Sequence, residues 1–318
     1  MSNLGVRKIS VIGAGNVGAE TANLLVSREL GDVVLIDKLG DMARGKALDI
    51  LTSASLKGSA SRIVGSDDYS LIAGSDVVVI TAGLARKPGM SREDLVGMNG
   101  NIIAEITKNV VKYAPNAIII MVTNPLDVMT SLAQKVSGFA PVRVIGMAGV
   151  LDTIRFKTFI AEGLKVASRD VTAMVLGGHG DDMLPLTDCA TVSGVPLKQL
   201  MDEETLSRIV ERTKNGGAEI VSLLKTGSAY YAPAASAVEM VEAVVKDRKS
   251  IMPVSVLLNG EYGIKDIYLG VPAVIGAGGA ERIIEFRLSE DELEKLQASA
   301  KVVKDTINKL ENLMSVIK

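Results

Sequence analysis

The first half of the chain alternates short apolar segments with longer segments of helical periodicity, and this alternation is the feature that most restricts its fold. Most of the short segments are apolar at nearly every position, which is typical of strands buried on both faces of a parallel sheet. Parallel strands need crossover connections, so helices between them predict a doubly wound sheet. The expected strands cover residues 8–12, 33–36, 61–64, 77–80, 118–122 and 142–145, and the expected helices cover residues 17–29, 41–54, 92–113 and 126–137.

The pattern changes near residue 150, where a short linker is expected at residues 146–150. The second half mixes helices and strands without regular alternation, which is typical of an α+β domain. The sequence therefore predicts two domains, at residues 1–148 and 149–318. The expected helices of the second cover residues 152–162, 203–225, 228–246 and 289–316, and its expected strands cover residues 170–176, 186–192, 251–258 and 267–275.

The composition excludes several classes of protein. The single cysteine, Cys189, has no partner for a disulfide, and one histidine with one cysteine cannot form a His/Cys zinc site, so we expect no metal. The net charge of −2 gives no electrostatic footprint for nucleic acid or an anionic membrane, and no partner of either kind is expected. The sequence also lacks an apolar run of about 18 residues and a signal-peptide pattern, which predicts a cytoplasmic location.

Residues 13–18 form a glycine-rich loop between the first expected strand and the first expected helix. In such a loop Gly13 permits a tight turn, Gly15 lets the backbone approach a pyrophosphate, and Gly18 lets helix and strand pack closely. The free N–H groups of the helix start then face the phosphates. This predicts a Rossmann dinucleotide site at Gly13, Ala14, Gly15, Asn16, Val17 and Gly18.

Asp37 ends the second expected strand, about 20 residues after the loop. A carboxylate there accepts hydrogen bonds from both hydroxyls of the adenine ribose and repels a 2′-phosphate, which favours NAD over NADP. Taken alone, Asp37 could also be an ordinary acid at a strand end or a helix cap.

The segment after the fourth expected strand carries three positive charges, at Arg86, Lys87 and Arg92. Open α/β sheets bind ligands beyond the carboxyl ends of their strands, where this segment lies. It is either a solvated surface loop or a loop that closes over an anionic substrate. Ser91 and Asp94 form a possible capping box for the helix that follows.

Asn124 follows the fifth expected strand and precedes Pro125. Its amide could contact cofactor and substrate, or it could be the N-cap of the next helix. Asp152 and Arg155 share one face of a helix at i, i+3 spacing, and the plain reading of that spacing is a surface ion pair.

His179 lies in a cluster of glycines, Gly177-Gly178-His179-Gly180-Asp181. The glycines leave the ring accessible and let the backbone come near a ligand. A lone histidine is often structural, but one that follows a strand in such a cluster indicates a general acid–base near neutral pH.

Together, in order and spacing, these motifs resemble the lactate/malate dehydrogenase family from about residue 6 to the C-terminus. The segments 86–92, 146–152 and 177–181 carry the resemblance, and they are most similar to its lactate-dehydrogenase-like bacterial branch of malate enzymes. The resemblance implies an NAD-dependent enzyme that oxidises malate to oxaloacetate reversibly. The alternatives are a lactate or other 2-hydroxyacid dehydrogenase on the same fold, and a non-catalytic NAD-binding protein.

The resemblance also implies roles for individual residues. His179 would exchange the proton, Asp152 would hold its ring and raise its pKa, and Arg155 would bind the C1 carboxylate as a bidentate fork. Arg92 would polarise the reacting carbonyl. Asn124 would contact substrate and the nicotinamide region, and the residues that help to seat NAD would be Asn99, Val122, Thr123 and Asn124.

Arg86 would select the substrate, since the family typically has Arg there in malate enzymes and Gln in lactate enzymes. A second carboxylate left unpaired in a closed site would cost about 3–5 kcal/mol, and pyruvate would leave Arg86 unpaired in turn. Ala229 matches a pocket wall and leaves room for the larger diacid. The resemblance further implies a homotetramer or a homodimer. The long helices within residues 203–246 and the amphipathic helix at residues 41–54 could form the subunit interfaces.

Overall fold

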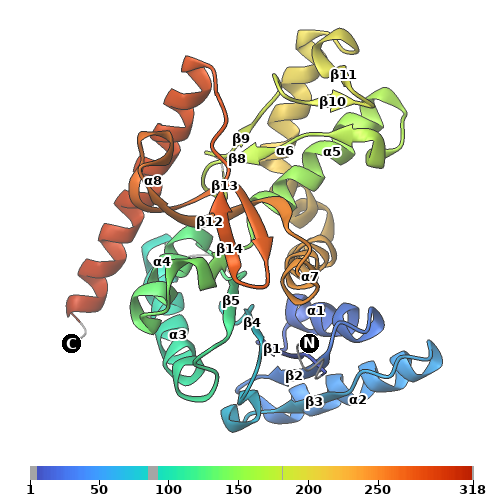
Figure 1. Cartoon of the computed structure of the whole chain (residues 1–318), viewed down its shortest axis with the longest axis vertical. Helices are drawn as coiled ribbons and strands as arrows, with labels where there is room; N and C mark the ends of the chain where they lie inside the picture. Colours follow the sequence, from blue (N-terminus) through green and yellow to red (C-terminus); the bar gives the residue numbers. More distant parts are fainter. Residues whose placement is uncertain (1–5, 85–91, 181, 317–318) are drawn as a thin grey trace.

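The computed structural model describes residues 6–84, 92–180 and 182–316. Within these residues, nine strands form one sheet in the order β14-β13-β12-β6-β5-β4-β1-β2-β3. Helices cover this sheet, and the long helix α8 (Glu290–Val316) runs along one side of the molecule past α4 and α3 (Figure 1). The expected α/β class, with a parallel Rossmann sheet followed by a part that mixes helices and antiparallel strands, is confirmed.

The first half alternates strand and helix as predicted. Its elements are β1 (Lys8–Ile12), α1 (Asn16–Ser27), β2 (Asp32–Ile36), α2 (Gly40–Leu56), β3 (Ile63–Ser66), β4 (Val77–Ile80), α3 (Arg92–Tyr113), β5 (Ile118–Met121), α4 (Leu126–Ser137) and β6 (Val144–Gly146). The neighbouring strands from β3 to β6 pair in parallel. Every residue of β4 and β5 is buried, because helices pack on both faces of these central strands.

The second half extends the same sheet with three strands and also forms two small antiparallel sheets, one of three strands and one of two. Its elements are α5 (Gly149–Leu164), β7 (Val171–Thr172), β8 (Val175–Leu176), β9 (Leu184–Pro185), β10 (Thr191–Val192), β11 (Val195–Pro196), α6 (Glu203–Leu224), α7 (Tyr231–Val245), β12 (Ser250–Asn259), β13 (Lys265–Gly276), β14 (Gly279–Ile283) and α8. Strand β12 joins β6 antiparallel through the pair Ser255–Gly146, and β13 and β14 add antiparallel strands beyond it.

The linker expected at residues 146–150 is shorter than predicted, because β6 ends at Gly146 and α5 begins at Gly149, so that only residues 147–148 connect them. The glycines here serve close packing. A Cβ on Gly146 would lie 2.8 Å from the Cβ of Ser255, and a Cβ on Gly149 would lie 2.8 Å from the Cβ of Pro253. Strand β12 therefore packs directly against the junction.

The strand expected at residues 170–176 is split into β7 and β8, and within the strand expected at residues 186–192 only β10 is formed. The chain changes its pairing partner between Thr172 and Val175, since β7 pairs with β10 whereas β8 pairs with β9. Gly177 then turns with φ +88° and pairs with Gly270 of β13, which brings the end of β8 to the large sheet. Among the described residues, the structure has no helix of the length and apolar character that a membrane span requires.

Candidate functional site

The glycine loop has the geometry that a dinucleotide phosphate requires. Gly13 adopts φ +105°, and a Cβ there would lie 2.6 Å from the backbone nitrogen of Ala82. A Cβ on Gly18 would lie 1.8 Å from the carbonyl oxygen of Gly13, so only glycine lets α1 sit this close to β1. In contrast, a Cβ on Gly15 would meet no atom of the described residues within 4 Å, which leaves open space beside the loop.

Helix α1 begins at Asn16, and no side chain in the described part of the chain caps its first turn at Gly15. The N–H groups of that turn therefore remain available for an anion. The open Gly15 and the uncapped helix start fit a bound pyrophosphate.

Asp37 follows β2 and is fixed beside the glycine loop. Its Oδ2 accepts a hydrogen bond from the backbone N–H of Ala14 at 2.7 Å, and its Oδ1 accepts one from Leu39 at 3.0 Å. It is not the cap of α2, whose N-cap residue is Leu39. The sequence reasoning missed Lys46 of α2, whose Nζ donates to the carbonyl oxygen of Ala14 at 2.7 Å. Asp37 and Lys46 thus hold the Ala14 backbone from two sides.

Asn99 and Thr123 hold the backbone at the carboxyl ends of β4 and β5. The buried Asn99 donates from Nδ2 to the carbonyl oxygen of Asn124 at 2.8 Å and accepts from the N–H of Leu84 at 2.8 Å. Thr123 donates from Oγ1 to the carbonyl oxygen of Ala82 at 2.7 Å. These bonds fix the rim of the sheet, and Val122, next to Thr123, is half-buried there.

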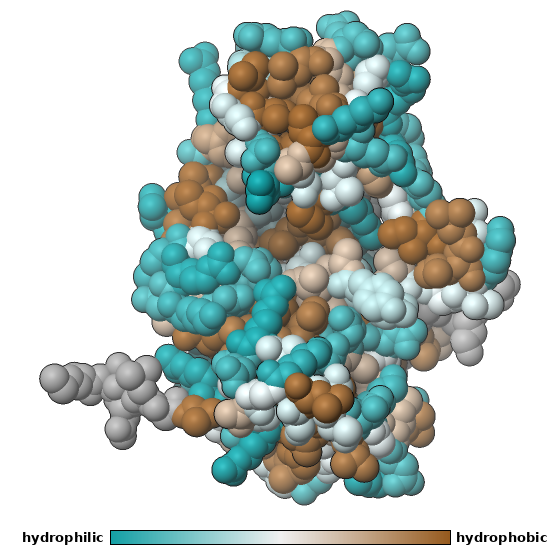
Figure 2. All heavy atoms as spheres, turned by 90° about the vertical axis from the view of Figure 1, so that its right-hand side faces the viewer, coloured by the Kyte–Doolittle hydropathy of each residue, from teal (hydrophilic) through white to brown (hydrophobic). Residues whose placement is uncertain are grey.

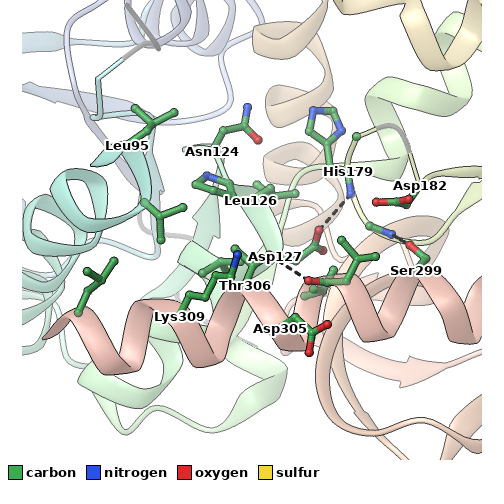
Figure 3. A pocket seen from close by; sticks show the side chains of 18 residues that line it. Leu95, Asn124, Leu126, Asp127, His179, Asp182, Ser299, Asp305, Thr306 and Lys309 are labelled. Carbon is green, nitrogen blue, oxygen red and sulfur yellow. Dashed lines mark hydrogen bonds between the residues drawn. The ribbon is translucent and has the colours of Figure 1, made fainter. Parts of the chain in front are cut away.

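Asn124 is not the N-cap of α4, because Pro125 occupies that position without a side-chain cap bond. The Asn124–Pro125 peptide bond is cis. The exposed side chain of Asn124 instead lines the same cavity as His179 (Figure 3).

His179 and Asp152 form a hydrogen-bonded pair. The Nδ1 atom of His179 lies 2.8 Å from Oδ2 of Asp152. Asp152 lies in α5 and is only 1% exposed. Burial alone would lower the pKa of His179, but the negative charge and hydrogen bond of Asp152, with the charge of Asp127, raise it above its ordinary value. The pKa increase predicted from the sequence is confirmed in direction.

Arg155 and Asp152 are not a surface ion pair. Their side chains are 12% and 2% exposed, and Nη1 of Arg155 lies 3.5 Å from Oδ1 of Asp152. Burial lowers the pKa of Arg155, and its Nε has no hydrogen-bond partner among the described residues. A buried guanidinium with an unused donor is suited to an anionic ligand.

The sequence reasoning missed Asp127, which supports the histidine segment from α4. Its Oδ2 accepts a hydrogen bond from the backbone N–H of His179 at 3.0 Å (Figure 3). Its Oδ1 accepts one from Ser255 Oγ at 2.6 Å. Burial raises the pKa of Asp127. Asp127 lies in the first turn of α4, where acidic residues are common because they interact favourably with the helix dipole, so its position in the sequence does not mark it as functional. Only tertiary structure brings it to His179.

A cavity of about 550 Å³ opens in front of His179. Residues of α3, α4 and α8 line it together with the loop that carries His179 (Figure 3). Arg86 lies outside the described residues, as do the side chains of Arg92 and Asp94 and the whole of Ser91. The predicted roles of Arg86 and Arg92 and the capping box therefore stay predictions.

Comparison with known proteins gives matches over nearly the whole chain. Residues 7–146 match the family model described as lactate/malate dehydrogenase, NAD binding domain, and residues 149–314 match the α/β C-terminal domain of the same family. The malate dehydrogenase of Methanosarcina mazei is 54% identical over 304 residues, which cover 96% of this chain and 99% of that protein. The malate dehydrogenase of Geobacillus thermodenitrificans is 55% identical, with 96% and 98% covered.

Solved structures agree with these matches. The apo malate dehydrogenase of Picrophilus torridus has a TM-score of 0.96 at 44% identity, with 99% of this chain and 100% of that chain covered. The lactate dehydrogenase of Cryptosporidium parvum, solved with lactic acid and nicotinamide adenine dinucleotide, has a TM-score of 0.94 at 45% identity, with 98% and 99% covered.

Proposed function

The chain belongs to the lactate/malate dehydrogenase family, and we propose that it catalyses the reversible oxidation of malate to oxaloacetate with NAD. NAD is its cofactor. The observation that carries the proposal is the buried carboxylate of Asp152 between His179 and Arg155, because it joins a proton-exchanging group to an anion-binding group. The relatives named malate dehydrogenase support the choice of substrate.

NAD, when bound, takes up or gives the hydride. The residues proposed to hold it are the glycine loop of residues 13–18, Asp37, and the rim residues Asn99, Val122, Thr123 and Asn124. The open space at Gly15 and the fixed carboxylate of Asp37 support this assignment. A carboxylate at Asp37 favours NAD because it would repel the 2′-phosphate of NADP.

His179 is the group that takes up and releases the proton. Since Asp152 occupies Nδ1, the other ring nitrogen, Nε2, exchanges the proton with the substrate oxygen. In oxidation the neutral ring takes the hydroxyl proton of malate, and in reduction the protonated ring returns it to oxaloacetate. Asp152 stabilises the positive ring that exists after proton uptake.

Arg155 binds the C1 carboxylate of the substrate, and the second carboxylate is bound by Arg86. Arg92 polarises the carbonyl of oxaloacetate. The unused Nε of Arg155 supports the first role, and the resemblance of the segment 86–92 to malate enzymes of the family supports the other two.

A lactate dehydrogenase is the second candidate, because a lactate dehydrogenase is among the similar solved structures at 45% identity. The test is the kcat/KM for oxaloacetate and for pyruvate, measured by NADH absorbance. A preference for oxaloacetate supports the proposal. A preference for pyruvate would assign the second function, and no oxidation of NADH with either would refute both.

We further propose that residues 1–148 bind NAD, that residues 149–318 supply the substrate site, and that the enzyme works in the cytoplasm as a homotetramer or homodimer. Leu48 and Leu56 of α2 and Leu223 of α6 are 66%, 89% and 74% exposed in the single chain. Apolar patches are visible on the face that carries these helices (Figure 2). If light scattering gave a mass of 33.4 kDa in solution, which is the mass of a single chain, the proposed assembly would be contradicted.

A further inference from the structure

Three successive residues of the histidine segment are held by three different elements. Gly177 exchanges backbone hydrogen bonds with Gly270 of β13, and His179 donates its N–H to Asp127 of α4. Between them, Gly178 donates its N–H to the hydroxyl oxygen of Ser299 at 2.9 Å. Ser299 belongs to α8, far along the chain from His179, and Figure 3 shows its side chain reaching the loop that carries the ring.

The contact between this segment and α8 is tight as well as hydrogen-bonded. Ser299 is 2% exposed. A Cβ on Gly177 would lie 3.1 Å from Ser299 Oγ, and a Cβ on Gly178 would lie 3.0 Å from Cγ2 of Val303, one turn further along α8. Gly178 is buried, and without Ser299 its N–H would lose its hydrogen-bond partner.

We propose that Ser299 is a positioning residue that fixes the backbone of the proton-exchanging histidine. The ring itself is oriented by Asp152 through Nδ1, and the adjoining amide by Asp127. Ser299 supplies the remaining anchor, on the residue before His179. Loss of this anchor lets Gly178 move, and the ring then moves relative to both Asp152 and the substrate.

A movement of the ring would change its distances to the charged groups around it, and therefore the pKa of His179. Asp152 and Arg155 face it from α5 and Asp127 approaches from α4, whereas the α8 contact is the uncharged Ser299. A substitution at Ser299 therefore changes no charge. Any change in the titration of His179 has to come from altered burial of the ring or from altered distances to Asp152, Asp127 and Arg155.

The experiment compares Ser299→Ala and Ser299→Cys with the unaltered protein. Cysteine keeps nearly the volume of serine but accepts hydrogen bonds weakly, so it separates the lost acceptor from lost packing. The matched control is Gln297→Ala, which removes another side chain–backbone hydrogen bond of α8, from Gln297 to the carbonyl oxygen of Tyr262 at 3.0 Å.

The first readout is the NMR titration of the imidazole, whose ring signals need no assignment among residues because the chain has one histidine. Both Ser299 variants are expected to show a pKa of His179 below that of the unaltered protein, and Gln297→Ala is expected to leave it in place. An unchanged titration in Ser299→Ala, or in Ser299→Cys alone, would overturn the proposal.

The second readout is kinetic, and only this part rests on the proposed function. With oxaloacetate, kcat should fall about ten- to hundredfold in both Ser299 variants, because a small displacement of a catalytic group has an effect of this size. The dissociation constant for NADH should stay within about twofold, since Ser299 is remote from the glycine loop. A loss of NADH affinity equal to the loss of kcat would indicate general disruption and refute the positioning role. If the unaltered protein does not reduce oxaloacetate, the proposed function fails while the titration still decides the role of Ser299.

Discussion

Replacing Asp152 by Asn tests the central pair of the site. The substitution keeps the shape of the side chain but removes a charge that lies 2.8 Å from His179 and 3.5 Å from Arg155. Two unit charges about 4 Å apart at an effective dielectric constant of about 20 interact by about 4 kcal/mol. If the positive ring loses that stabilisation as proton transfer occurs, kcat falls by about three orders of magnitude.

The direction of the pH dependence follows from the pKa shift. The raised pKa of His179 keeps the ring protonated to a higher pH than an ordinary histidine. Reduction of oxaloacetate, which needs the protonated ring, should therefore persist to higher pH, and oxidation of malate should fall off as pH decreases through that pKa. In Asp152→Asn, burial and the nearby Arg155 both oppose the charged ring, so both limits should move to lower pH.

The assay is the pH dependence of single-turnover rates in both directions, followed by NADH absorbance. The control is Asp188→Asn, which removes a half-exposed carboxylate paired with Lys198 and should change neither rate nor pH profile. If Asp152→Asn retained the pH limits of the unaltered enzyme, Asp152 would not set the titration of His179, and the reasoning would be refuted.

Three further substitutions test the other parts of the site. His179→Asn should bind NADH normally by fluorescence but lose most of kcat, because no second histidine exists to replace it, and substantial remaining activity would contradict the role. Arg86→Gln should shift the ratio of kcat/KM from oxaloacetate towards pyruvate by about two orders of magnitude, from the cost of an unpaired buried carboxylate, and an unchanged ratio would exclude Arg86 as the selective residue. Gly18→Ala should weaken NADH binding and lower the melting temperature together, since its Cβ would collide with the carbonyl oxygen of Gly13, and normal binding by calorimetry would show that the loop adapts.

The parallel half of the sheet could be predicted because its strands are buried on both faces. A segment such as Val77–Ile80 is apolar throughout, and few structures other than a central strand accommodate that pattern next to long helices. The glycine loop was equally predictable, because at Gly13 and Gly18 a side chain would collide with neighbouring atoms.

The second half was less predictable because its structure depends on distant partners. Residues 170–176 were predicted as one strand, yet β7 and β8 within them pair with different strands. Likewise, the spacing of Asp152 and Arg155 is the same on an exposed and on a buried face of a helix, and only packing decides between the two. Asp127 and Ser299 reach His179 from 52 and 120 residues away in sequence, and no local pattern marks either of them.

The continuity of the sheet from β6 to β12 has a mechanical consequence. Many enzymes close on their substrates by rotating one domain about a flexible connection to the other. Here the pair Ser255–Gly146 and the bond from Ser255 to Asp127 join the two halves through the sheet itself, and only residues 147–148 connect β6 to α5. The glycine loop and His179 are therefore joined through one continuous sheet. A rotation of one half against the other would have to break the Ser255–Gly146 pair and the bond from Ser255 to Asp127.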